Sequence, residues 1–138
     1  MREEAMNAFE TTVQADAATA EAAVRDALGA QGFGVVSEID VAANLKNALG
    51  VERPPLKILG ACSPALVQQA LAIDSSIALL LPCNVVLDQA GGGTRVRIVD
   101  PQALMDDPRF ANLARAVSDS LRAALAAIDG QLATGATA

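Results

Sequence analysis

The stretch LLLPCNVVLDQAGGGTRVRIVDP, residues 79–101, decides the fold. Two runs rich in Leu, Val and Ile flank a short loop that contains the glycines at 91–93. Apolar runs joined by a short glycine-rich loop are typical of an antiparallel hairpin. The glycines do not form a phosphate-binding loop, because no Lys-Ser or Lys-Thr pair follows them and the next segment has the pattern of a strand. The sequence therefore predicts two paired strands, over 77–88 and from Thr94 onward.

Upstream of this hairpin, three further segments have the pattern of strands. In the first, Phe9, Thr11 and Val13 alternate with polar residues, which is the two-residue period of a half-buried strand. The second follows Gly32, and the third begins after a pair of prolines that favour extended backbone. The expected strands are residues 9–13, 33–40 and 56–61.

Four helices are expected between and after these strands. Asp16 and Ser63 are good N-cap residues, and Pro64 suits the first turn of a helix. The last helix starts at Asp107, carries a long apolar stripe and is expected to end at Gly130. The expected ranges are 16–32, 41–49, 63–74 and 107–130.

This order of elements predicts an α+β fold, namely a two-layer sandwich with a five-stranded mixed sheet and helices packed on one face. A chain of 138 residues with 52% hydrophobic content has the size of one domain and can bury a real core. We expect that domain to span residues 8–130, between an N-terminal extension at 1–7 and a flexible tail at 131–138.

Composition excludes several classes of function. The chain contains no His, so Ser-His-Asp and Cys-His nucleophiles and histidine metal sites cannot form within it. A net charge of −6 and the absence of Trp and Tyr argue against a nucleic-acid partner. No run approaches the roughly 18 apolar residues of a membrane span, and the N-terminus is charged, so we expect a cytoplasmic protein without membrane contact.

The two cysteines are the main candidates for chemistry. Cys62 ends the third expected strand and Cys83 lies in the fourth. Strand alternation predicts that both thiols point to the same apolar side of the sheet. Cys62 precedes a helix whose first N–H groups would stabilise a thiolate, so it is expected to be the more reactive thiol. Ordinary core packing of both cysteines is the alternative.

A proline inside an apolar run suggests an interruption of the strand. We expect Pro82 to end the pairing there, because proline lacks the N–H that a ladder needs. Cys83 and Asn84 would then face a small cavity shared with Gly60 and Cys62.

Three segments together resemble a known family. GFGVVSEIDVAANLKNALG, KILGACSPALVQQAL and LLLPCNVVL, followed by a hairpin ending in VDP, are similar to the bacterial and archaeal family called domain of unknown function 302. The resemblance runs from about Phe9 to Pro101, and the combination of G-A-C-x-P with L-P-C-N is its specific part. It implies a compact α/β sandwich that often forms a homodimer, with no established activity.

The resemblance also implies positions of interest. They are Asp40, Cys62, Pro64, Pro82, Cys83 and Asn84. Family members often carry Asn where this chain has Ser63, a change that preserves helix capping. With Gly60 and Ser63 added from the local patterns, the candidate ligand-binding residues are Asp40, Gly60, Cys62, Ser63, Pro64, Pro82, Cys83 and Asn84.

Two functions from different classes follow. The first is a homodimeric binding or sensing domain with a small ligand or a soft metal ion near the cysteines, for which thiolates suit copper(I) or zinc. The alternative is thiol chemistry, in which Cys62 carries a persulfide or forms a transient disulfide with Cys83. A purely structural partner-binding domain is a third option. Binding is favoured over catalysis because no general base is paired by local spacing, and the cofactor stays unknown.

Overall fold

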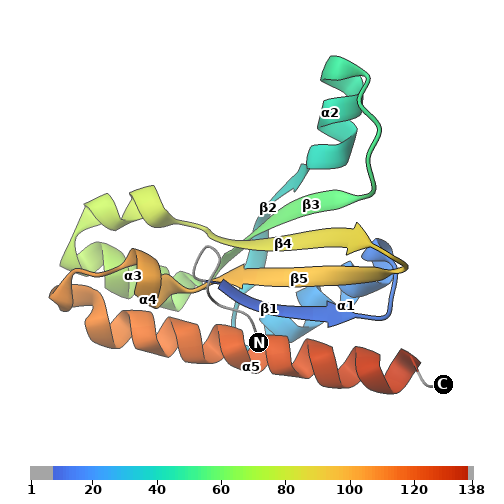
Figure 1. The fold of residues 1–138 in the computed structure, drawn as a ribbon. Coiled ribbons are helices and arrows are strands. Elements are labelled where there is room, and N and C mark those ends of the chain that lie inside the picture. Colours follow the sequence, from blue (N-terminus) through green and yellow to red (C-terminus); the bar gives the residue numbers. More distant parts are fainter. Residues whose placement is uncertain (1–7, 137–138) are drawn as a thin grey trace.

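A computed structural model describes residues 8–136, with side chains except at 131 and 133–136 (Figure 1). The expected N-terminal extension, 1–7, lies outside the described residues. The strands are β1 Ala8–Val13, β2 Gly34–Asp40, β3 Leu56–Cys62, β4 Cys83–Ala90 and β5 Gly93–Val99. The helices are α1 Ala17–Ala30, α2 Val41–Leu49, α3 Pro64–Ile73, α4 Pro101–Leu104 and α5 Ala111–Ala136, with 3-10 helices η1 Ser75–Leu80 and η2 Pro108–Phe110.

The strands form one five-stranded sheet in the order β1-β5-β4-β3-β2. The predicted α+β fold with five strands is confirmed, but the sheet is antiparallel throughout rather than mixed, since even β1 and β5 run in opposite directions. The predicted hairpin joins β4 to β5. At its turn Gly91 and Gly92 have φ angles of 60° and 84°, a left-handed backbone that glycine adopts without steric cost.

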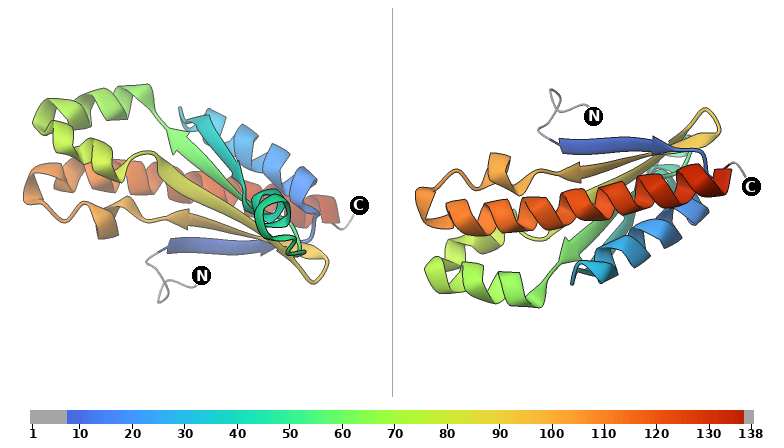
Figure 2. Two further views of the ribbon diagram at one scale, coloured as in Figure 1. Left: turned by 90° about the horizontal axis from the view of Figure 1, so that it is seen from above. Right: turned by 90° about the horizontal axis from the view of Figure 1, so that it is seen from below.

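Helices α1 and α5 lie side by side and cover one face of the sheet (Figure 2). Leu28 of α1 and Leu121 and Ile128 of α5 are fully buried against Leu59 and Val85 of the sheet. Burying an aliphatic side chain of this size stabilises a fold by about 1.5–3 kcal/mol relative to leaving it exposed. The apolar stripe of the last helix thus forms one side of the main core.

Aspartates begin most of the helical segments. The carboxylate of Asp16 accepts a hydrogen bond from the backbone N–H of Thr19 at 2.8 Å, and that of Asp40 accepts one from Ala43 at 2.9 Å. Asp74, Asp100 and Asp107 cap η1, α4 and η2 in the same way. Such caps satisfy donors that a helix leaves without an internal partner.

The apolar run before Pro82 is helical rather than extended. Residues Ser75–Leu80 form η1, the Leu81-Pro82 peptide bond is cis, and β4 starts at Cys83. The predicted strand over 77–88 is therefore wrong in its first part, because a short apolar run fits a buried helical turn as well as a strand. The expected end of pairing at Pro82 is confirmed, since Cys83 is the first residue of β4 paired with β3.

Gly60 in β3 allows two side chains to approach the backbone. A Cβ at this position would lie 2.6 Å from Cγ of Pro82 and would collide with Oγ of Ser37. Ser37 and Pro82 therefore occupy the space that the absent side chain leaves. Gly60 therefore does not line either of the cavities described below.

We predict that Gly60→Ala lowers the free energy of unfolding by about 2 kcal/mol, because the new methyl group would overpack this site. Gly29→Ala in α1 is the matched control, since an added Cβ there meets nothing within 4 Å. That control should raise the stability by up to about 1 kcal/mol through helix propensity. Urea unfolding of both variants measures the difference, and equal stability of the two would contradict the close approach at Gly60.

The C-terminal helix begins and ends differently from the prediction. Its expected first turn is η2, and α5 proper starts at Ala111. The end expected at Gly130 is wrong, because α5 continues to Ala136 and overlaps the tail expected at 131–138. Leu132, only 8% exposed, follows Ile128 by one turn and extends the apolar stripe past the glycine. Within residues 8–136, no helix is long and apolar enough to cross a membrane.

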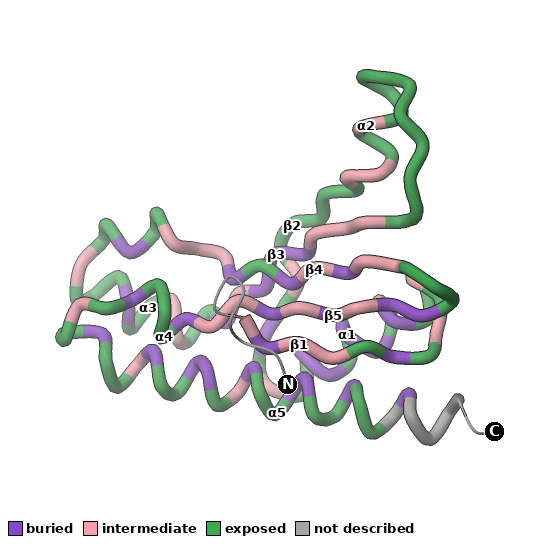
Figure 3. The backbone as a smooth tube through the Cα atoms, in the orientation of Figure 1, coloured by how far each residue is buried: buried purple, intermediate pink, exposed green. Residues whose placement is uncertain are grey.

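Residues 36–55, here called the arm, extend away from the body of the molecule (Figure 1). They comprise most of β2, all of α2 and the link to β3, and no residue of α2 is buried (Figure 3). Val36 is 64% exposed and Leu49 72%, and Ile39 and Val51 are also exposed. The arm therefore presents apolar side chains that none of the described residues covers.

Candidate functional site

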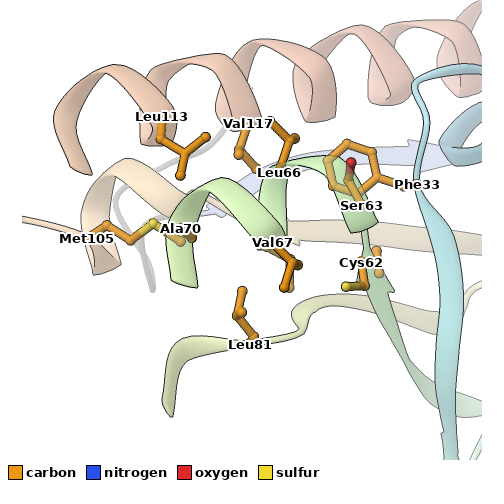
Figure 4. A pocket seen from close by; sticks show the side chains of 12 residues that line it. Phe33, Cys62, Ser63, Leu66, Val67, Ala70, Leu81, Met105, Leu113 and Val117 are labelled. Carbon is orange, nitrogen blue, oxygen red and sulfur yellow. The ribbon is translucent and has the colours of Figure 1, made fainter. Parts of the chain in front are cut away.

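Two clusters of buried apolar side chains meet beside α3. The larger cluster lies between the sheet, α1 and α5, and the smaller one joins α3, η1, α4 and the first turns of α5. At their junction a cavity of about 30 Å³ remains (Figure 4). Its walls are Phe33, Ala61, Cys62, Ser63, Leu66, Val67, Ala70, Leu81, Cys83, Met105, Leu113 and Val117.

Cys83 is the more deeply placed thiol. It is 6% exposed and belongs to the main core cluster. Burial raises the pKa of its thiol to about 11, with a smaller contribution from charge on Cys62. Cys83 therefore carries a proton at neutral pH and behaves as a small apolar group.

Cys62 is the last residue of β3 and is partly exposed. Figure 4 shows its sulfur directed toward Val67 and Leu81, two other residues of the cavity wall. Helix α3 starts two residues later. Of the two cysteines, Cys62 is thus the one that solvent and small molecules can reach.

The prediction that both thiols share one side of the sheet is wrong. Ala61 pairs with Cys83 and Leu59 with Val85, so Ala61 and not Cys62 lies on the helix-covered face with Cys83. Cys62 lines the cavity because the strand ends there and the chain turns into α3. A disulfide needs Cβ atoms that point toward each other, so this register opposes a Cys62–Cys83 bond without backbone movement.

Ser63 provides an unexpected polar group in the cavity wall. It occupies the N-cap position of α3, yet its side chain forms no cap hydrogen bond. Ser63 is 7% exposed, and its hydroxyl has no hydrogen-bond partner among the described residues. The N–H groups of Ala65 and Leu66, in the first turn of α3, likewise find no acceptor in the described chain. The start of α3 therefore offers two backbone donors and a hydroxyl that can either donate or accept a hydrogen bond.

The other predicted site residues lie elsewhere. Asn84 is exposed and pairs with Gly60 in the sheet, so neither it nor Gly60 lines the cavity. Pro82 contacts Gly60, and Pro64 is exposed in the first turn of α3. Asp40 caps α2. Of the eight candidates, Cys62, Ser63 and Cys83 line the cavity and the remaining five do not.

Sequence reasoning missed most of the cavity wall. The missed residues are apolar and come from β3, α3, α5, the residue before β2, the link after η1 and the C-cap of α4, namely Phe33, Ala61, Leu66, Val67, Ala70, Leu81, Met105, Leu113 and Val117. Apolar residues in amphipathic helices are normally read as core, and nothing in their spacing distinguishes a cavity wall from a packed interior.

The polar groups of this cavity suit a metal ion poorly. The described part of the chain holds no group of three or more His, Cys, Asp or Glu side chains that could bind one. A copper(I) or zinc ion would depend on two thiols that start on opposite faces of the sheet, one of them buried and protonated. The backbone donors and the hydroxyl at the start of α3 suit a small polar ligand better than a metal ion.

A second cavity, of about 480 Å³, lies between the start of α1 and the base of the arm. Its charged groups are already paired, because Nζ of Lys57 lies 2.9 Å from Glu21 and Asp40 caps α2. Burial opposes ionisation of Glu21, but the hydrogen bonds from Lys57 and Arg25 outweigh it and lower the pKa of this carboxyl. These groups stabilise the base of the arm and leave little bonding capacity for a ligand.

The fold and the site together define a small α+β domain with a thiol-bearing apolar cavity at the start of α3. Residues 9–128 match the family model described as Domain of unknown function DUF302. The chain belongs to this family, and the resemblance inferred from its motifs is confirmed.

A solved structure supports the same assignment. The chain is similar to a protein described as "uncharacterized conserved protein DUF302 from Bacillus stearothermophilus", with a TM-score of 0.81 and 25% sequence identity. The similarity covers 90% of this chain and 99% of that one. None of the curated proteins matches this sequence.

Proposed function

We propose that this protein is a binding or sensing domain that holds a small ligand in the cavity at the start of α3. The observation that carries the proposal is the cavity itself, whose wall includes the partly exposed Cys62 and the side chain of Ser63. The Ser63 hydroxyl makes no cap hydrogen bond and is not a fully buried atom, so it is available to a ligand or to solvent. Binding is favoured over catalysis because the wall offers only thiols and a hydroxyl for proton exchange.

Native mass spectrometry of protein purified from its host tests this proposal. We expect a small adduct that is absent from the Cys62→Ser variant, because a ligand held beside this thiol would lose its main contact. Asn84→Ala is the control, since Asn84 lies outside the cavity. Protein that carries no adduct, or an adduct unaffected by Cys62→Ser, would count against the site.

We also propose that the protein is a homodimer and that the arm forms the interface. The family resemblance implies a homodimer, and the exposed side chains of Val36, Ile39, Leu49 and Val51 support the choice of surface. β2 is an edge strand, paired only with β3 among the described strands. A second copy would cover both the apolar side chains and the free edge.

Analytical ultracentrifugation of wild type and two variants tests the arm interface. We expect a dimer at micromolar concentration, and a dissociation constant at least about tenfold higher for Val36→Asp, because a charge would enter an apolar contact. Leu79→Asp is the control, since Leu79 is 88% exposed and lies in η1 rather than in the arm. A wild-type monomer, or a dimer weakened only by Leu79→Asp, would overturn this interface.

A cytoplasmic location is the remaining part of the proposal. Both cysteines are free thiols, as expected in a reducing compartment. Fractionation of cells that produce an epitope-tagged protein, with detection of the tag in each fraction, would test this location.

A further inference from the structure

We propose that a groove between η1 and the segment from α4 to η2 binds an amphipathic helix of another protein, one with leucine-like side chains on one face and lysines or arginines beside them. These elements lie with α3 at the end of the molecule away from α2 (Figure 1, Figure 2). The groove shares only Met105 with the wall of the cavity beside Cys62. This inference therefore does not depend on the ligand proposed above.

The floor and walls of the groove are apolar. Six side chains supply them, namely Ile77, Leu79, Leu80, Leu104, Met105 and Phe110. Ile77, Met105 and Phe110 belong to the smaller core cluster, so packing fixes the floor. Leu79 is 88% exposed and Leu104 is 42% exposed. The mouth of the groove therefore presents leucines that none of the described residues covers.

The exposure of Leu79 is unusual in its setting. Its exposed fraction is the highest among the large apolar side chains of the described residues. Single exposed leucines are common on protein surfaces, but Leu79 shares a groove with Leu104 from a different element. A side chain this exposed contributes little to the stability of its own fold, because burial is what stabilises an apolar group. Its apolar surface is available to a partner.

The charges at the groove are predominantly negative. Asp106 and Asp107 line it, and Asp74 lies beside it through an ion pair with Arg109 at 3.0 Å. Arg109 is the one cationic side chain of the lining, and it also pairs with Asp107 at 2.8 Å. Asp106 forms no ion pair with any described residue. Three carboxylates thus surround one guanidinium, and this excess attracts a cationic partner and repels an acidic one.

The shape of the groove favours a helix as its occupant. Its walls are helical segments, and none of the described strands contributes to them. An extended peptide binds by pairing with the edge of a sheet, whereas an amphipathic helix places apolar side chains in a groove between other helices. The groove holds about 280 Å³, slightly less than the roughly 300–1,000 Å³ of a small-molecule site. Side chains of a partner helix are therefore a better fit than a free ligand.

A fluorescein-labelled model peptide tests the groove. The probe is a synthetic helix of about 14 residues, or four turns, with leucines on one face and lysines on the other. Fluorescence anisotropy should show that the wild-type protein binds it at low ionic strength. The same peptide with glutamates in place of the lysines should bind at least about tenfold more weakly, because the groove is acidic. A lysine peptide that does not bind, or binds no better than the glutamate peptide, would overturn the proposal.

Substitution of Leu79 tests where the peptide binds. Leu79→Ser should weaken binding of the lysine peptide about tenfold, which is the factor that burial of one leucine commonly supplies. Leu49→Ser is the matched control, since it removes a 72% exposed leucine from the arm. The control should bind the peptide as the wild type does. Equal losses in the two variants would mean that the peptide adheres to any exposed leucine, which would refute the groove.

Substitution of Asp106 tests the role of charge. Asp106→Asn should weaken binding about threefold and make it less sensitive to salt, because a carboxylate at the protein surface contributes only modestly. Asp26→Asn makes the same change in net charge, and Asp26 is exposed in α1 outside the groove. An equal loss in Asp26→Asn would trace the attraction to the net charge of the protein and contradict a specific acidic groove.

Other occupants of the groove would give different results. A second copy of this chain would be indicated if Leu79→Ser raised the dissociation constant of a dimer in ultracentrifugation. A lipid surface would be indicated if wild type but not Leu79→Ser bound vesicles of phosphatidylcholine. Either result, together with no binding of the lysine peptide, would replace the proposed partner helix.

Discussion

Iodoacetamide added to the native protein is expected to alkylate Cys62 at least about 1000 times faster than Cys83. Cys83 is 6% exposed in the main core, and its thiol has a pKa raised to about 11, so it must be uncovered before it can react. Uncovering a core residue requires an opening whose free energy approaches that of global unfolding, which is commonly 5 kcal/mol or more, about 1000-fold or above. Timed alkylation with peptide mapping measures both rates.

Two variants make this comparison specific. Cys62→Ser should leave a native protein that scarcely reacts, and Cys83→Ala should react at the wild-type rate of Cys62. In concentrated urea both cysteines should react alike. Equal protection of both thiols in the native state would return them to ordinary core packing and remove Cys62 from the proposed site.

Alkaline pH is expected to destabilise the wild-type protein by about 3 kcal/mol more than the Cys83→Ala variant. The pKa of Cys83 rises from its ordinary 9.0 to about 11 on folding. Each pH unit of such a difference corresponds to about 1.4 kcal/mol, which gives about 3 kcal/mol in total. The unfolded chain loses this proton first, so the stabilisation is complete below pH 9 and disappears as the pH rises toward 11.

The composition leaves few other groups that titrate in this pH range. The chain has no Tyr, and Cys62 is the only other cysteine. Urea unfolding at intervals from pH 8 to pH 11 gives the stability of both proteins, and their difference cancels the titration of the lysines that they share. Parallel curves for wild type and Cys83→Ala would show that Cys83 is not buried as described.

Local patterns predict much of this fold because the sequence of most elements favours the secondary structure that they adopt. The alternation around Phe9, the cap at Asp16 and the turn glycines each indicate the observed element. The apolar run before Pro82 is the main exception. This run is too short for the spacing of its apolar residues to distinguish a strand from a helical turn. Ile77 and Leu80 pack in the smaller core cluster, and this tertiary packing favours the helical turn.

The candidate site is less predictable, because it depends on register. Both faces of β3 carry aliphatic side chains, such as Ile58 on one and Leu59 on the other, so the sequence does not show which face meets the helices. The pairing of Ala61 with Cys83 determines which face of β3 meets the helices. That pairing joins residues on different strands, so local sequence does not reveal it. Ser63 could be assigned to the site from its position next to Cys62, but its lack of a cap bond is a property of the folded backbone.

The position of β1 at the sheet edge has a consequence for protein synthesis. β1 pairs only with β5 among the described strands, and this ladder joins Ala8 to Val99. On the ribosome β1 therefore emerges long before its partner, and Phe9 stays uncovered until β5 and then α5 have left the exit tunnel. Long-range strand pairing of this kind folds slowly and leaves nascent chains open to aggregation. The first strand made is among the last to be protected, so translation arrest before β5 should yield a chain that depends on chaperones.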